Sequence, residues 1–150
     1  MTDSTGEPGD VREIPTHECL ALLRESPVGR LAVVVEGRPE IFPVNHVVDH
    51  GTVVLRTASG TKFSGSVGLP VAFEVDGYDA GTGEAWSVVV HGTGRSILRI
   101  EEVVDALQLT IVPWQGGPKP QMVRIVPDRI TGRRFRVAGG FRRQGPDPAS

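Results

Sequence analysis

The sequence predicts a mainly β protein, built as a single domain whose strands close into a barrel. Valine is the commonest apolar residue, and the 150 residues include 19 glycines and 12 prolines, a composition that suits strands joined by tight turns. At least six segments alternate apolar and polar residues and follow one another with meander connections. A closed barrel removes the exposed edges of such a sheet. Strands and helices do not alternate regularly, which disfavours a Rossmann fold.

The first predicted element is a helix in the segment THECLALLRESPVG, which starts at Thr16. Thr16 is the predicted N-cap, because its hydroxyl can accept a hydrogen bond from a free backbone N–H. Cys19 and Leu23 lie at helical spacing, and we expect Cys19 to be a small buried apolar side chain. Pro27 and Gly29 end the helix.

Three strands are predicted over residues 30–57. Two turn signals divide them, EG at 36–37 and DHG at 49–51, and both are typical of hairpins. Pro43 falls in the middle of the second strand, where it costs a ladder hydrogen bond and predicts an edge or bulge position. Such an interruption frees nearby backbone groups to face a planar ligand, and Asn45 adds a side-chain contact.

The second half of the chain continues the strand pattern with further turns and helices. Pro127 interrupts the last strand and predicts a bulge or an edge position there. The predicted elements are a short helix over 61–68, strands over 70–79 and 84–97, a helix over 99–108, a loop over 113–120 and a final strand over 121–137.

The composition limits the class of protein. One domain is predicted over residues 12–141, with disordered polar tails at 1–11 and 142–150. The net charge of −2 provides no field that attracts nucleic acid or an anionic membrane. Cys19 is the single cysteine, so neither an internal disulfide nor a cysteine-based zinc site is expected. We expect a cytoplasmic protein, because the polar start does not resemble a signal peptide and no apolar run approaches the roughly 20 residues that span a bilayer.

The segment LRTASGTKFSGS, residues 55–66, concentrates hydroxyls, glycine and two cations at the end of a strand. A phosphate needs hydroxyl and N–H donors, close approach of the backbone, and a compensating cation. Arg56 and Lys62 supply charge, and Ser59 and Thr61 supply hydroxyls. The spacing is not that of a P-loop. The segment therefore indicates either a phosphate site or a polar turn with a solvated lysine.

Six segments occur in a fixed order along the chain: GRLA, PEIFPVNHVV, VLRTASGTK, VAFEVDGYD, EAWSVVVHGTGR and RIVPDRITGRR. Their order and spacing resemble the pyridoxamine 5′-phosphate oxidase-like flavin-binding split-barrel family, in the actinobacterial branch related to nitroimidazole-resistance proteins. The resemblance covers residues 13–137. It implies a six-stranded split β-barrel with a few short helices, which forms a homodimer with two FMN sites at the subunit interface.

The resemblance also implies which residues bind FMN. The backbone that lines the isoalloxazine ring would be that of Pro43, Val44 and Asn45. The phosphate would be bound by cations and by hydroxyl or backbone donors, which are Arg56, Thr57, Ser59, Thr61 and Lys62. Trp86 and Ser87 begin a strand that would approach the cofactor from the same or the partner subunit, and Trp114 would cover a site from across the interface.

Relatives of this kind differ in their cofactor. The C-terminal segment ITGRRFRVAGGFRRQ lacks the Trp and Arg pattern that binds the vitamin B6 phosphate in true oxidases, so B6 oxidation is not expected. The resemblance leaves FMN, the deazaflavin F420, haem and no cofactor as alternatives, of which FMN is our prediction.

Two functions follow from these observations. The first is an oxidoreductase that uses a bound flavin to reduce a nitroaromatic, quinone or similar small substrate; the cofactor performs the chemistry, so no catalytic side chain is assigned. The second is a non-catalytic module that stores, senses or sequesters a flavin. A nucleic-acid-binding barrel ranks last, because aromatic residues make up only 5% and the net charge is negative.

The four histidines show no spacing typical of a helical metal site, and no metal is predicted. We expect His50 and His91 to be surface or strand-end residues, and we keep His46 as a candidate because it lies beside the proposed ring site. The arginines at 133, 134 and 136 alternate with apolar residues, as expected for a solvated strand face.

Overall fold

The structure, a computed structural model, describes residues 11–57, 67–97 and 121–137. Within these ranges the chain forms one helix and seven strands. In chain order the elements are β1 (Val11–Glu13), α1 (Thr16–Glu25), β2 (Val28–Val35), β3 (Arg38–Asp49), β4 (Thr52–Thr57), β5 (Pro70–Asp79), β6 (Glu84–Ser96) and β7 (Gln121–Arg136).

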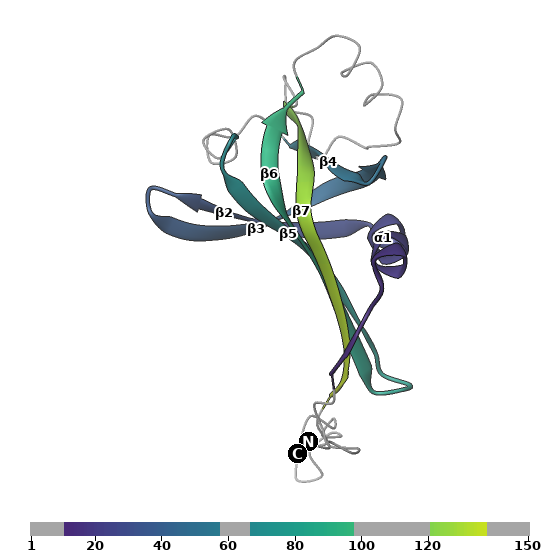
Figure 1. The fold of residues 1–150 in the computed structure, drawn as a ribbon. Coiled ribbons are helices and arrows are strands. Elements are labelled where there is room, and N and C mark those ends of the chain that lie inside the picture. The colour runs from purple at the N-terminus through teal and green to yellow at the C-terminus, as the bar shows by residue number, and fades with distance from the viewer. Residues whose placement is uncertain (1–10, 58–66, 98–120, 138–150) are drawn as a thin grey trace.

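The strands form one antiparallel sheet that closes on itself. Its order is β1-β7-β4-β3-β2-β5-β6, and a further pairing of β6 with β7 joins the two sides. Six strands, β2 to β7, therefore make a ring, and the short β1 pairs with the last part of β7, beyond the residues that pair with β4 (Figure 1). The predicted mainly β, six-stranded barrel is confirmed. Strand β1 begins at Val11, the last residue of the predicted N-terminal tail.

The two predicted hairpin turns are present and have the twist that two-residue hairpins require. Glu36 and Gly37 have φ of 53° and 76°, and His50 and Gly51 have φ of 52° and 76°. Positive φ at both central residues is the type I′ geometry, which matches the right-handed twist of the flanking strands. The tight turns fix the register of β2 on β3 and of β3 on β4.

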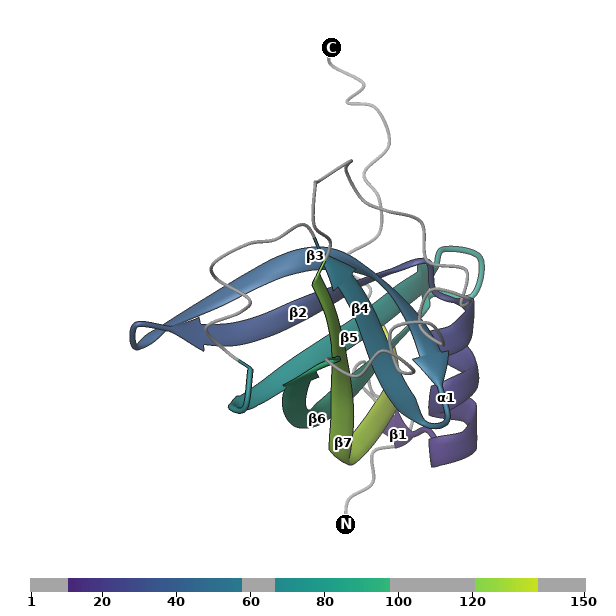
Figure 2. The same cartoon turned by 90° about the horizontal axis from the view of Figure 1, so that it is seen from above.

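The predicted interruption at Pro127 is a β-bulge in β7. His91 of β6 is opposite Arg129, but Gly92 is opposite Pro127, so Asp128 is an extra residue on β7. A bulge bends its strand and increases the local twist. The bend lets one half of β7 pair with β4 while the other half pairs with β1 (Figure 2).

The predicted N-cap of helix α1 is wrong by one residue. Pro15 is the N-cap and Thr16 is the first helical residue, with no side-chain capping hydrogen bond. The extended Pro15 places its carbonyl to accept hydrogen bonds from the N–H groups of Glu18 and Cys19, at 3.0 and 2.9 Å. The helix therefore starts with backbone hydrogen bonds and no side-chain cap. The proline ring sets φ near −65°, and proline has no side-chain donor or acceptor.

Helix α1 packs one face directly against the barrel wall. Cys19 and Leu23 are fully buried, as predicted for Cys19. A Cβ on Gly132 of β7 would lie 2.5 Å from the Cys19 Sγ and 3.0 Å from the Cβ of Ile14. Glycine is therefore required at position 132 for the helix to approach the strand this closely.

The barrel interior is filled by alternate residues of every strand, as the period of two requires. The buried core comprises Ile14, Cys19, Leu23, Leu31, Val33, Val44, Val53, Leu55, Val71, Phe73, Val75, Val88, Val90, Val123 and Ile125.

The predicted helices over 61–68 and 99–108 and the predicted loop over 113–120 lie outside the described residues, apart from a turn at 67–68.

His46 belongs to this interior. It is 8% exposed, its Nε2 lies 2.9 Å from the carbonyl oxygen of Leu23, and its ring meets Phe73 edge to face at 4.8 Å. Since a carbonyl only accepts, Nε2 carries the proton and donates, while Nδ1 has no partner among the described residues. Burial lowers the pKa of His46, which the hydrogen bond to Leu23 partly opposes. His46 therefore ties β3 to α1 and does not face a ligand, so its selection as a candidate site residue was wrong.

Gly92→Ala is expected to destabilise the barrel strongly, because a Cβ there would lie 2.2 Å from the carbonyl oxygen of Val126, and the paired backbone cannot retreat. Overpacking of this kind costs about 1–3 kcal/mol. The matched control is Gly94→Ala on the same strand, whose nearest atom would be 3.7 Å away. Urea unfolding of both variants checks this; equal stabilities would contradict the close approach of β6 and β7.

His46→Gln is expected to flatten the pH dependence of the free energy of unfolding. Because the folded-state pKa of His46 is lowered, the unfolded chain binds more protons than the folded chain below about pH 6.5. The native protein therefore loses stability from this group as the pH falls below that value. Glutamine does not titrate and can still donate to Leu23. Unfolding at pH 7, 6 and 5 should show a smaller acid loss in the variant, and parallel curves would be the contrary result.

Candidate functional site

Two of the predicted cofactor-binding side chains meet on the outside of the barrel. Asn45 of β3 and Arg56 of β4 are directly opposite each other in the antiparallel ladder. Their neighbours His46 and Leu55 point inward into the core, so alternation places Asn45 and Arg56 together on the outer face. Both side chains are half-buried. A cation and an amide are thus held side by side by backbone pairing rather than by a flexible loop.

The edge of β3 next to Asn45 is open on one side. Residues 38–44 pair with β2, and in the described part of the chain no strand flanks their other side. Pro43 is exposed, whereas the side chain of Val44 is buried in the core. The β2–β3 register runs without a shift through Pro43, so this position is an edge and not a bulge. Only the backbone of Val44 is available to a ligand, and its role in lining a ring stays a prediction.

An apolar cluster forms the floor beside Arg56. Val54, Ile97 and Met122 are buried outside the main core, and Val47 packs against them. Met122 is the residue of β7 opposite Arg56. The outer face of β3, β4 and β7 therefore combines a buried apolar cluster with one cation and one amide.

An ion pair fixes the far end of this face. Arg124 of β7 donates from Nη1 to the Asp49 carboxylate at 3.0 Å and to the Thr52 hydroxyl at 2.8 Å. The hydrogen bond from Arg124 lowers the pKa of Asp49. Because Asp49 and Thr52 flank the β3–β4 turn, this contact holds the hairpin against β7 and keeps Met122 in line with Arg56.

The structure does not bring Trp86 and Ser87 to this face within one chain. They lie on β6, which is separated from β3 by two strands in either direction around the ring and so forms the opposite wall. Trp86 points inward, packs against the core and covers Gly77, where a Cβ would lie 2.7 Å from its Nε1. Ser87 is opposite Asp76 and points outward.

The remaining predicted site residues are only partly described. The backbone of Thr57 pairs with Gln121 at the end of β4, and its side chain lies outside the described part of the structure. The other four, Ser59, Thr61, Lys62 and Trp114, lie outside the described residues.

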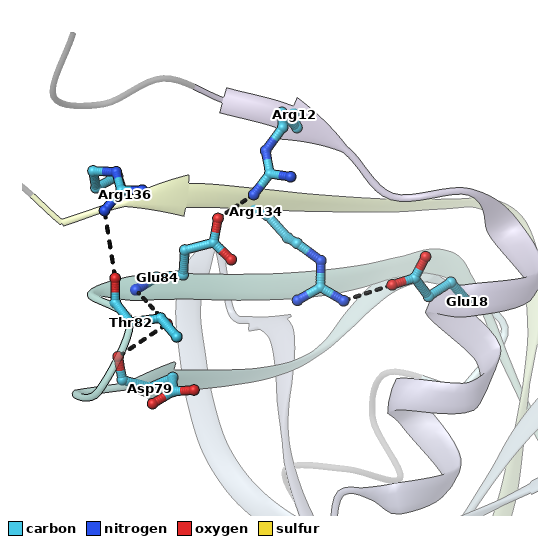
Figure 3. Close-up of polar contacts among 7 residues, drawn as sticks. All are labelled: Arg12, Glu18, Asp79, Thr82, Glu84, Arg134 and Arg136. Atoms are coloured by element: carbon cyan, nitrogen blue, oxygen red, sulfur yellow. Dashed lines mark hydrogen bonds and ion pairs between the residues drawn. The ribbon is translucent and has the colours of Figure 1, made fainter. Parts of the chain in front are cut away.

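The arginines near the end of β7 have structural partners. Arg134 is 2.5 Å from Glu18 of α1, and Arg136 donates to the Thr82 carbonyl at 3.4 Å (Figure 3). Arg12 of β1 pairs with Glu84 of β6 in the same region. These contacts attach the N-terminal segment to the β6–β7 ladder, so this surface is an ion-pair network rather than a bare basic face.

Sequence reasoning missed a charged cluster on the neighbouring wall. Arg30 of β2 donates from Nη1 to Glu74 and to Asp76 of β5, both at 3.1 Å. Burial raises the pKa of Glu74 to about 7, and the hydrogen bond and charge of Asp76 add to this effect, while Arg30 opposes it. The signal in the sequence was one arginine within an otherwise apolar strand, VGRLAVVV, which places a charge on an outer face.

Two further features of the described residues bear on the class of protein. No helix among them has the length and apolar character needed to cross a bilayer. Within the same ranges, no three histidine, cysteine, aspartate or glutamate side chains are grouped as metal ligands.

Comparisons with known proteins agree with this architecture. An uncharacterized protein of Mycobacterium tuberculosis, Rv0080, is 34% identical over 132 residues, which cover 84% of this chain and 86% of that protein. The structure of an FAD-binding protein from Mycobacterium smegmatis matches with a TM-score of 0.77 and 36% identity, over 85% of this chain and all of the other. An FAD-binding protein from Mesorhizobium loti shares the fold at a TM-score of 0.69 and 22% identity, over 84% of this chain and 97% of that one.

The family assignment rests on a match to nearly the whole described domain. The family model described as pyridoxamine 5′-phosphate oxidase matches residues 15–134, from the start of helix α1 to near the end of β7. Together with the relatives above and the closed six-stranded ring, this match shows that the chain belongs to the pyridoxamine 5′-phosphate oxidase family.

Proposed function

We propose that the protein binds a flavin nucleotide, FMN in the first instance, on the outer face of β3 and β4. The observation that carries the proposal is the direct opposition of Asn45 and Arg56 beside the open edge of β3. The FAD-binding relative from Mycobacterium smegmatis supports a flavin and makes FAD the closest alternative.

The residues present fit the chemistry of such a cofactor. A flavin nucleotide joins an anionic phosphate to a flat ring with amide-like donors and acceptors at one edge. Arg56 supplies a cation for the phosphate, and charge-assisted hydrogen bonds of this kind are the strong ones. The backbone of 43–45 and the Asn45 amide offer partners to the ring edge. Thr57, Ser59, Thr61 and Lys62 remain the proposed phosphate donors that complete the site.

We further propose a homodimer in which the cofactor lies between subunits. Ser87 faces outward from the wall opposite to Asn45 and Arg56, so one ligand cannot touch both walls of the same barrel. A second copy of the chain can supply this contact. Trp114 stays a proposed contact from the partner, and so does the partly buried Trp86, which packs against the core of its own chain.

The proposed activity is reduction of a small oxidised substrate, such as a nitroaromatic or a quinone. When bound, the flavin supplies the electron transfer; this chain supplies binding, orientation and partial exclusion of water. Arg56 and Asn45 hold the cofactor, and the Arg124–Asp49 pair keeps the β3–β4 hairpin in place beneath it. A deazaflavin reductase and a non-catalytic flavin-binding module are the alternatives.

The cofactor is identified by purifying the full chain and recording its visible spectrum before and after addition of FMN, FAD or F420. We expect tight binding of FMN or FAD with one flavin per chain. Anaerobic reduction followed by mixing with a nitroaromatic or quinone then separates the functions: rapid reoxidation is expected for the enzyme, and binding without reoxidation indicates the module. A chain that binds none of the three would refute the proposal.

Arg56→Ala is expected to weaken FMN binding roughly 10- to 100-fold, because losing a hydrogen bond to a charged group costs about 1.5–3 kcal/mol. Arg56→Lys should recover part of the affinity. The matched control is Arg129→Ala, an exposed arginine on β7, which should bind FMN as the native chain does.

Riboflavin, which lacks the phosphate, provides the second comparison for the Arg56 variants. Its affinity is expected to change little in Arg56→Ala, since the lost interaction is with the phosphate. Fluorescence titration measures both ligands. An equal loss for FMN and riboflavin would place Arg56 at the ring or in the fold rather than at the phosphate.

A further inference from the structure

The outer face of β2 and β5 carries a charged cluster in an apolar setting, formed by Arg30, Glu74 and Asp76. One guanidinium nitrogen, Nη1 of Arg30, is 3.1 Å from a carboxylate oxygen of Glu74 and 3.1 Å from one of Asp76. The two carboxylates are two residues apart on β5 and so share its outer face. With all three groups ionised the cluster carries one negative charge, and one added proton makes it neutral.

The cluster lies in line with the proposed ring site. Arg30 is directly opposite Pro43 of β3 on one side and directly opposite Glu74 of β5 on the other. Neighbouring strands are about 4.8 Å apart, so Glu74 lies roughly 10 Å across the sheet from Pro43. This separation is close to the screening length of about 8–10 Å at physiological ionic strength, so a charge at one position is felt at the other.

The surroundings of Glu74 explain why its pKa lies above the ordinary value. Its side chain is 29% exposed, and burial raises its pKa to about 7, assisted by Asp76. From β2 the charged group that faces it is Arg30, because Val28 and Ala32 are apolar. From β6 it is opposite Val89, and the nearest outward titratable group is His91, opposite Ala72. No other titratable side chain is placed around it in the described ladders.

We propose that the Arg30–Glu74–Asp76 cluster takes up a proton when a flavin bound beside Pro43 is reduced. The inference rests on the proposed function. Reduction adds negative charge to the flavin at neutral pH, and this charge favours protonation of a carboxylate nearby. By Coulomb's law at roughly 10 Å, with an effective dielectric constant of about 20 and the ionic screening expected at this distance, one added charge strengthens proton binding at Glu74 about threefold. The linkage is reciprocal, so the protonated cluster also favours the reduced flavin.

The two electrons come from an external chemical reductant such as dithionite. Protons from water bind both to the flavin and to the Glu74 carboxylate, and no bond within the protein breaks. Glu74 does not touch the proposed site, so it acts through the electrostatic field and is a positioning residue rather than a catalytic one.

Proton uptake on reduction tests the inference directly. The pH dependence of the midpoint potential of the flavin-bound chain counts the protons bound per two electrons. A threefold change in proton affinity centred near pH 7.2 corresponds to about a quarter of a proton more than in Glu74→Gln, which keeps a partner for Arg30 but cannot ionise. The matched control is His91→Gln, which should retain the native proton count. Equal counts in the native chain and Glu74→Gln would overturn the inference and leave flavin binding intact.

A second measurement needs no flavin. Carboxyl NMR titration of the flavin-free full chain should show Glu74 titrating near pH 7, and Asp76→Asn should move its midpoint toward the ordinary value of about 4.3. An ordinary midpoint in the native chain would overturn the inference by itself. A chain that binds no flavin, but in which Glu74 titrates near pH 7, would overturn the inference together with the proposed function.

Discussion

The antiparallel pairing of β6 with β7 is the interaction on which the rest of the structure depends. It joins Glu84–Ser96 to the strand that also pairs with β4, and so converts an open sheet into a ring. The close approach at Gly92 and the extra residue Asp128 bend β7 at one point of this ladder. Because of that bend a single strand pairs with β6 throughout, with β4 near its start and with β1 near its end.

The candidate site is a consequence of the two faces of β3. Alternation places Val44 and His46 in the core, and it places Pro43 and Asn45 outside. The hydrogen bond from His46 to the helix and its contact with Phe73 fix this phase, since a slip of one residue would bury Asn45 and expose the histidine. The position of the Asn45 amide beside Arg56 is therefore set by packing on the opposite side of the strand.

The sequence predicted most of the fold because its signals are local. The hairpin turns at 36–37 and 49–51, the alternation of the strands and the interruption at Pro127 depend on neighbouring residues, and the structure agrees with each. The N-cap at Thr16 was wrong because a proline carbonyl competes with a hydroxyl for the same role. The expectation for His46 was wrong because residues adjacent in a strand point to opposite faces of the sheet, so His46 enters the core while Asn45 faces outward.

The sequence by itself determined that strands and turns would form a barrel, because turn chemistry and β propensity are encoded within a few residues. Tertiary structure alone decided which of these residues share a surface. It placed Asn45 with Arg56, sent Ser87 to the opposite wall, and turned Trp86 into the core. It also joined Arg30 to two carboxylates on β5, more than forty positions away. These outcomes depend on strand order and register, which arise only when the ring closes.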